Sequence, residues 1–246
     1  VLAGARRRDA AQEPALARLA SDPEVPAIVR ATALALAAGY GGEASGRAVL
    51  EGLGSDEALL RIGAVRGARR FEARVRWRLL APLLDDARRA VRTEAVRALL
   101  DVRAALDDPA RARLDLAIRA WLRQLEFLAD RADGQTRMAE ARLALGDPAG
   151  AEAALARALV LEPGWVPALV NLADLLRATG RDPEGGPLLR RALELAPDSA
   201  DALVARALWL VRQGRREAAV PLLARASALD PAAPERAWLY AVALSS

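Results

Sequence analysis

The stretch that decides the fold is EPGWVPALVNLADLLRATGR, which runs from Glu162 to Arg181. Apolar residues recur in it every three or four positions, which is the spacing of one face of an α-helix. Gly180 follows the last of them, and glycine is the residue that takes up the left-handed backbone of a helix C-terminal cap at little cost. The stretch therefore predicts a helix that ends in a glycine turn, with one amide, Asn171, among its apolar side chains.

This pattern recurs through the second half of the chain with a period of 34 residues. Four sets of positions keep the period: Gly146, Gly180 and Gly214; Leu155, Leu189 and Leu223; Ala158, Ala192 and Ala226; Pro163, Pro197 and Pro231. A helix, a glycine turn, a second helix with small residues at the crossing, and a proline before the next unit are typical of tetratricopeptide repeats. Residues 132–246 are therefore predicted to hold three full repeats and a truncated fourth.

The first half has its own period, 31 residues, seen in VRATALA (29–35), LRIGAVR (60–66) and VRTEAVR (91–97). An apolar residue, an arginine and then an alanine three positions on indicate the second helix of a short HEAT-like repeat. The preceding helices are expected near 12–20, 44–53 and 72–84. Ser55 and Asp86 are expected to cap the helices that follow them, because Ser and Asp side chains accept hydrogen bonds from unpaired N–H groups.

These periods predict an all-α, right-handed α-solenoid. Residues 1–106 would form HEAT-like repeats, 107–131 a connecting helix, and 132–246 the tetratricopeptide repeats. No alternating strand pattern is present, and no Gly/Ser-rich or Pro-rich linker separates the two repeat types.

The amino-acid composition excludes most of the familiar kinds of catalytic site. The 246 residues include no cysteine and no histidine, so the chain offers no thiolate, imidazole, zinc site or haem attachment. We expect no enzyme activity, no metal and no cofactor in this chain, although an enzyme that uses only carboxylates remains a rival hypothesis. No apolar run is long enough to span a bilayer.

A tetratricopeptide array presents its first helices as a groove for extended peptides or partner helices. Counting in the 34-residue frame selects eight candidate groove positions: Arg137, Glu140, Val170, Asn171, Asp174, Arg177, Leu208 and Trp238. Asn171 could bind a peptide backbone as donor and acceptor. The alternative is that Asn171 is an ordinary repeat residue and that Asp174 and Arg177 form a surface pair.

Three regularly spaced arginines and four of the tryptophans are expected to have structural roles. Arg30, Arg61 and Arg92 recur once per 31 residues, and we expect each to bind acids or carbonyls of a neighbouring turn. Trp77, Trp121, Trp165 and Trp209 are expected at helix seams. Acidic and basic residues alternate, as in DDARR (85–89), so nucleic-acid binding is not favoured.

Four stretches together resemble the carboxy-terminal repeat region of bacterial multihaem (cytochrome c554-like) c-type cytochromes: residues 26–40, 83–102, 165–193 and 237–246. In that family a domain with CxxCH haem sites precedes HEAT and tetratricopeptide repeats. This chain has no CxxCH motif, so the resemblance implies that haem could be bound only by an upstream domain. It also implies a periplasmic location.

The leading functional hypothesis is a non-catalytic scaffold that binds a protein or peptide, as the repeat region of such a cytochrome. It could also pack against the upstream cytochrome domain, or self-associate through its open C-terminal repeat. The alternative is a stand-alone cytoplasmic adaptor that binds peptides in the tetratricopeptide groove.

Overall fold

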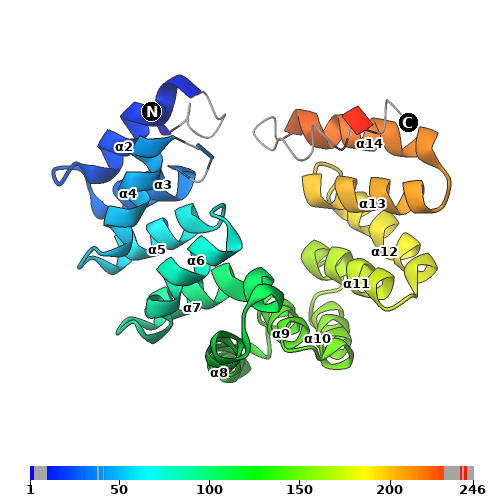
Figure 1. Ribbon diagram of the computed structural model, residues 1–246. Helices are drawn as coiled ribbons and strands as arrows, with labels where there is room; N and C mark the ends of the chain where they lie inside the picture. The colour runs from blue at the N-terminus through cyan, green and yellow to red at the C-terminus, as the bar shows by residue number, and fades with distance from the viewer. Residues whose placement is uncertain (3–9, 38, 41, 230–238, 240, 243–246) are drawn as a thin grey trace. The chain divides into compact units, whose positions relative to one another are not determined.

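The computed structural model describes residues 1–2, 10–37, 39–40, 42–229, 239 and 241–242 (Figure 1). The chain divides into two compact units, Val1–Trp121 and Leu122–Ser246. Every regular element in the described ranges is a helix. The prediction of an all-α solenoid is therefore confirmed. The boundary between the units falls inside the helix that was expected to connect the two repeat types.

The first unit contains pairs of helices that succeed one another along the chain, coloured blue to cyan and green in Figure 1. Its elements are η1 (Ala10–Gln12), α2 (Glu13–Ser21), α3 (Ala27–Ala37), α4 (Glu43–Leu53), α5 (Ala58–Ala68), α6 (Ala73–Leu80), η2 (Ala81–Asp85), α7 (Arg89–Leu99), η3 (Leu100–Ala105) and α8 (Asp108–Leu125). Helices α3, α5 and α7 begin at residues 27, 58 and 89, which reproduces the 31-residue period. Helix α5 packs against both α3 and α7.

Two expected helices are shorter than the sequence pattern suggested. The helix expected over 72–84 ends at Leu80 and continues as the 3₁₀ segment η2. Pro82 lies at the start of η2, and a proline has no N–H with which to continue an α-helix. Helix α8 ends at Leu125 and is followed by the 3₁₀ segment η4 (Glu126–Leu128), so the apolar spacing of 109–131 does not form one continuous helix.

The core of the first unit is built from small residues at helix crossings. Ala33, Ala64 and Ala95, one from each repeat, have no exposed surface. Gly63 lies where α5 crosses α3, and a Cβ atom at this position would collide with the Ala31 backbone. The glycine therefore allows the backbones of α3 and α5 to approach closely.

Each arginine of the ladder binds acids or carbonyls of a neighbouring turn, as predicted, and Arg30 and Arg61 also connect their repeat to the next one. Arg30 donates to the Ala20 carbonyl oxygen at 3.1 Å and to Glu57, in the turn before α5, at 3.1 Å. Arg61 makes two hydrogen bonds to Asp86, of 2.7 and 3.1 Å, and a third to the Ser55 carbonyl oxygen at 2.6 Å. The corresponding Arg92 donates to two carbonyl oxygens of the turn before its own helix.

The expected caps at Ser55 and Asp86 are wrong in detail. Ser55 Oγ accepts from the backbone N–H of Glu57, and Asp86 Oδ1 accepts from that of Arg88 at 2.7 Å. These N–H groups belong to the residues immediately before α5 and α7, so each side chain stabilises the turn that leads into the helix. The helices themselves start two residues later than a cap at these positions would place them.

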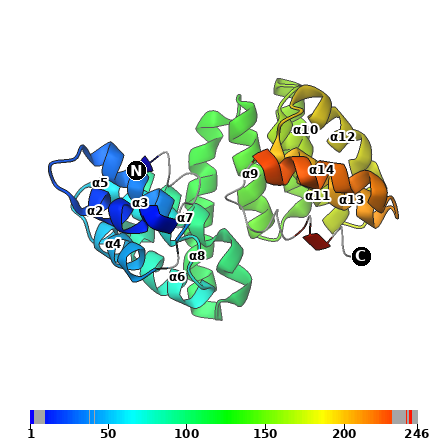
Figure 2. The ribbon, with the colours of Figure 1, turned by 90° about the horizontal axis from the view of Figure 1, so that it is seen from above.

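The second unit is a regular series of three described helix pairs, preceded by η4 (Glu126–Leu128). The first helices are α9 (Ala132–Ala144), α11 (Val166–Ala178) and α13 (Ala200–Arg212); the second helices are α10 (Pro148–Leu161), α12 (Asp182–Leu195) and α14 (Arg216–Leu229). Each kind begins every 34 residues. Helix α11 contacts both α9 and α13, so the first helices form a continuous layer. Figure 2 shows α11 and α13 on one side of this unit and α10 and α12 on the other.

The three glycine turns have the predicted backbone. Gly146, Gly180 and Gly214 have φ angles of 79°, 80° and 73°. The N–H of Arg181, directly after Gly180, donates to the Leu176 carbonyl oxygen at 2.7 Å, which closes the helix end. An added Cβ atom at any of the three glycines would meet nothing within 4 Å. Glycine is required here by the φ angle and not by lack of space.

The seam between the paired helices also follows the sequence prediction. Ala158, Ala192 and Ala226 have no exposed surface. The leucines three residues before them are exposed by no more than 2%. Pro231, Trp238 and most of the predicted fourth repeat lie outside the described residues.

Candidate binding groove

A groove with a volume of about 470 Å³ lies between the neighbouring first helices α11 and α13. Its lining comes from α11, from α13 and, at its base, from one residue of α12: Val170, Asn171, Ala173, Asp174, Arg177, Leu189, Asp201, Val204, Ala205, Leu208 and Arg212. The lining positions of α11 recur three or four residues apart and therefore share one helix face.

The floor of this groove is apolar. Ala173 and Leu189 are buried, whereas Val170, Val204 and Leu208 are half-buried and present part of their surface to the groove. Apolar surface that stays accessible can be covered by an apolar side chain of a ligand, which releases water from both. The floor therefore suits an apolar side chain better than a charged one.

Asn171 supplies the neutral polar group of the groove. Its side chain is half-buried, and no described residue hydrogen-bonds its amide. An amide offers a carbonyl acceptor and two N–H donors, which match the N–H and C=O groups of an extended peptide. Asn171 can therefore bind a peptide main chain without breaking an existing contact.

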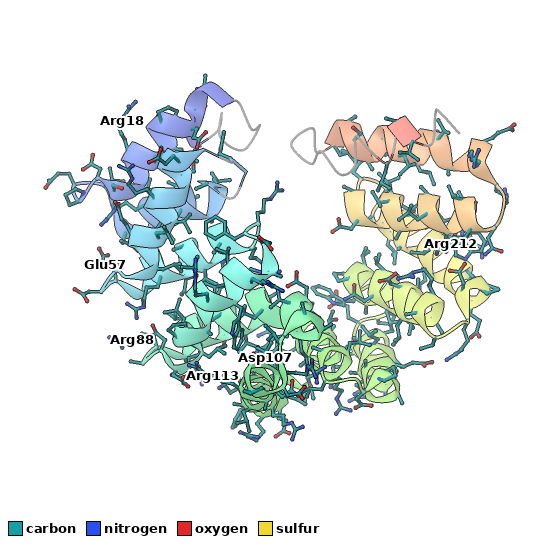
Figure 3. The ribbon with its side chains drawn as sticks, in the orientation of Figure 1. Arg18, Glu57, Arg88, Asp107, Arg113 and Arg212 are labelled. Carbon is teal, nitrogen blue, oxygen red and sulfur yellow. The ribbon has the colours of Figure 1, made fainter. Side chains whose placement is uncertain are left out.

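The charged residues of the rim are largely paired with one another. Arg177 contacts Asp174 at 2.9 Å. Arg212, labelled in Figure 3 where α13 ends, donates two hydrogen bonds to Asp182, of 2.7 and 3.1 Å. The hydrogen bond from Arg212 holds the pKa of Asp182 below its usual range. Because both arginines already hold carboxylates, the rim carries little charge that is free to attract an acidic ligand.

Five of the eight candidate residues lie together in this groove: Val170, Asn171, Asp174, Arg177 and Leu208. The pairing of Asp174 with Arg177 matches the structural alternative that the sequence left open. Arg137 and Glu140 do not line the groove; Arg137 lies 3.4 Å from Asp133, four residues before it on the same helix. Trp238 lies outside the described residues.

On α9 the position that the repeat frame places in the groove is closed. Thr136, the counterpart of Val170, is buried, and its hydroxyl accepts a hydrogen bond of 3.0 Å from the indole N–H of Trp165. Asp201 and Arg212 were missed, although their spacing from Leu208 on α13 could have identified them. Leu189 comes from a second helix, and only the packing of the pair brings it to the groove.

The tryptophans with described contacts have structural roles, as expected. Trp121 is 3% exposed. Besides the bond from Trp165, the indole N–H of Trp209 donates to the Asp182 carbonyl oxygen at 2.9 Å. Within the described residues no group of acidic side chains is arranged to hold a metal ion, and no helix is both long and apolar enough to cross a bilayer.

Comparison with known proteins shows the fold. No protein-family model matches the sequence, and no curated protein does. The solved structure of TTC0263, a thermophilic TPR protein in Thermus thermophilus, is 19% identical and matches with a TM-score of 0.51 over 81% of this chain and 99% of its own. A crystal structure of MamA is 16% identical and covers 69% of this chain and 88% of its own, at a TM-score of only 0.39. The chain thus has the fold of an α-solenoid, and this fold is similar to that of a solved tetratricopeptide-repeat protein.

Proposed function

We propose that this chain is a non-catalytic scaffold whose groove between α11 and α13 binds an extended peptide of a protein partner. The observation that carries the proposal is the joint presence of an accessible apolar floor and an amide, Asn171, that has no hydrogen-bond partner among the described residues. The floor would take one apolar side chain of the peptide, and Asn171 would bind its main chain.

The rim supports this kind of ligand over an acidic one. An acidic peptide would have to displace Asp174 from Arg177, or Asp182 from Arg212, before gaining a pair of its own. Such an exchange of one carboxylate for another gives little net free energy in an exposed setting. Affinity should therefore come from the apolar side chain and the main-chain hydrogen bonds.

The experiment is a selection of peptides from a random library on the purified chain, followed by affinity measurement with a selected, fluorescently labelled peptide. Val170→Asp places a charge on the groove floor, and Val160→Asp is the matched control, because Val160 is 69% exposed on α10, away from the groove. We expect Val170→Asp to abolish binding and Asn171→Ala to weaken it by about tenfold, the value of a main-chain hydrogen-bond pair. Unchanged affinity in both groove variants would rule the groove out.

The wider setting is also a proposal. The resemblance of residues 26–40, 83–102, 165–193 and 237–246 supports the repeat region of a larger periplasmic multihaem cytochrome whose haem domain lies upstream. The 31-residue period of the first unit supports the HEAT-like part of that arrangement. The partner would then be a protein of the same compartment, or the upstream cytochrome domain itself.

Sequencing the gene upstream of the codon for Val1 tests whether the chain is the repeat region of a multihaem cytochrome. CxxCH motifs preceded by a secretion signal are the expected result. A reading frame that begins shortly before Val1 without either feature would contradict the cytochrome setting, and it would favour the stand-alone adaptor. The peptide experiment is independent of that outcome.

A further inference from the structure

A second surface of the tetratricopeptide unit carries two arginines, Arg206 and Arg215, that form no ion pair with any described carboxylate. Arg206 on α13 lies over the ring of Trp209, with its guanidinium carbon 4.4 Å from the ring centroid. One of its nitrogens donates to the Gly186 carbonyl oxygen at 3.0 Å. The side chain is half-buried, and no described carboxylate lies within ion-pair distance of it. Burial, together with the nearby charges of Arg215 and Arg190, lowers the pKa of Arg206.

Comparison with the preceding repeats shows that this charge is a departure from the repeat pattern. The position of Arg206 is occupied by Leu172 one repeat earlier and by Met138 two repeats earlier. An apolar residue therefore satisfies the packing requirement of this position. The arginine adds a charge without a described carboxylate to receive it.

Arg215 shows the complementary change. Its counterpart Arg181 pairs with Glu152 at 2.9 Å and with Glu184 at 2.9 Å. At the positions 34 residues after these two acids the sequence has Gly186 and Ala218. An acid cannot simply be restored at 186, because a Cβ atom there would lie 2.5 Å from Cζ2 of Trp209. The tryptophan that supports Arg206 thus also removes an acidic partner of Arg215.

We use the name α12–α13 arginine cluster for Arg190 on α12, Arg206 on α13 and Arg215 in the turn after α13, because the charges of Arg190 and Arg215 both act on Arg206. A Glu194 oxygen lies 3.8 Å from Arg190 on an exposed helix face, whereas no described carboxylate forms an ion pair with Arg206 or Arg215. Because Arg206 and Arg215 have no described counter-charge, they repel one another, and an external anion relieves that repulsion. Arginine is also the side chain that binds carboxylates with two parallel hydrogen bonds.

We propose that the α12–α13 arginine cluster is a second docking surface, which binds an acidic segment of a protein partner. The segment would place carboxylates between Arg206 and Arg215. This surface is separate from the groove, since none of the three arginines lines it.

The surroundings favour an acidic protein segment over a nucleic acid. Single-stranded nucleic acids bind where aromatic rings are open for base stacking. Arg206 covers one face of Trp209, the ring also packs tightly against Gly186, and its N–H is bonded to the Asp182 carbonyl oxygen. The tryptophan therefore has a structural role and offers no stacking platform.

The test uses the whole purified chain and a fluorescently labelled peptide of alternating glutamate and glycine, with its glutamine counterpart as control. We expect the glutamate peptide to bind, with an affinity that falls as NaCl rises, and the glutamine peptide not to bind. A labelled single-stranded oligonucleotide is measured in parallel. Equal binding of both peptides, or tighter binding of the oligonucleotide with the same dependence on Arg206, would overturn the proposal.

Two variants and two controls locate the binding. Arg206→Leu restores the residue of the preceding repeat, and Arg215→Gln changes an exposed side chain that has no described partner, so the second remains informative even if the first perturbs folding. Each should weaken binding by about tenfold, the loss of one charge-assisted hydrogen-bonded contact. Arg157→Gln, on exposed α10 surface, and Asn171→Ala, in the groove, should leave it unchanged. A loss with Arg157→Gln as large as with Arg215→Gln would show that the attraction is general and not sited.

Discussion

Replacing Asp86 by asparagine should destabilise the first unit far more than the same change at its neighbour Asp85. Asp86 accepts two hydrogen bonds from Arg61 and one from the backbone N–H of Arg88. The side chains of Arg61 and Asp86 are only 13% and 7% exposed. Asp85 instead pairs with Arg113, which is labelled in Figure 3. In this pair the side chains of Arg113 and Asp85 are 48% and 76% exposed.

The magnitude follows from this difference in burial. Removing one partner of a buried pair leaves the other charge without compensation, at a cost of about 3 kcal/mol. An exposed pair contributes less than about 1 kcal/mol. With a urea dependence of about 2 kcal/mol per molar, Asp86→Asn should lower the unfolding midpoint by about 1.5 M and Asp85→Asn by less than about 0.5 M.

The dependence on pH gives a second readout. Burial alone would raise the pKa of Asp86, but the hydrogen bonds from Arg61 and Arg88 and the charges of Arg61 and Arg92 outweigh it and hold the pKa below its usual range. A carboxyl whose folded-state pKa is lowered stabilises the fold fully above its unfolded pKa, about 3.9, and loses that contribution as pH falls further. The difference between Asp86→Asn and the unchanged chain should therefore shrink below about pH 4.

Urea titrations followed by far-UV circular dichroism give the midpoints. Hydrogen exchange in residues 58–68 and 89–99 then reports whether α5 and α7 are the helices that open, which matters because repeat units need not unfold together. Equal midpoint shifts for Asp86→Asn and Asp85→Asn would refute the reasoning. Faster exchange confined to the second unit would do the same.

Two further predictions concern close contacts inside each unit. Gly63→Ala should cost about 2 kcal/mol, because the new methyl group collides with the Ala31 backbone, whereas Gly46→Ala, with nothing within 4 Å of its added Cβ, should stabilise by about 0.5 kcal/mol; urea midpoints of the opposite order would contradict this. Trp165→Phe removes the hydrogen bond to Thr136 and should cost about 1 kcal/mol, and an unchanged midpoint for the second unit would show that this bond contributes nothing.

The fold was largely predictable because each repeat carries its signal at several positions at once. The glycines at 146, 180 and 214 predicted the ends of the three first helices of the second unit, which lie two residues before them. The break after Leu80 was missed because the apolar spacing continues through it, and the backbone consequence of Pro82 outweighed that spacing. The spacing of apolar residues predicts which face of a helix is buried. Where the helix ends depends on residues such as proline and glycine that change the backbone.

The groove was less predictable, for a physical reason. Counting in the repeat frame selects positions on a first helix, but whether a position is open depends on the side chain of the neighbouring repeat. Thr136 occupies a groove position and is nevertheless closed by Trp165. The sequence analysis also missed the arginine cluster. The cluster lacks counter-charges because Glu152 and Glu184, which pair with Arg181, have no acidic counterparts one repeat later. Only the structure shows that these two acids bind Arg181, and therefore that their loss leaves Arg215 without the same partners.

The glycine turns have a consequence that concerns chirality. At Gly146, Gly180 and Gly214 the backbone takes a φ that L-residues disfavour, although the space that the Cβ atom of an L-residue would occupy is open. A D-amino acid prefers this φ, because its allowed backbone region is the mirror image of that of an L-residue. A chain made by chemical synthesis with D-alanine at these positions should keep the same turns. It should also unfold less readily, since D-alanine restricts the unfolded chain more than glycine does. Glycine stands at these turns because ribosomal synthesis supplies no D-residue to take its place.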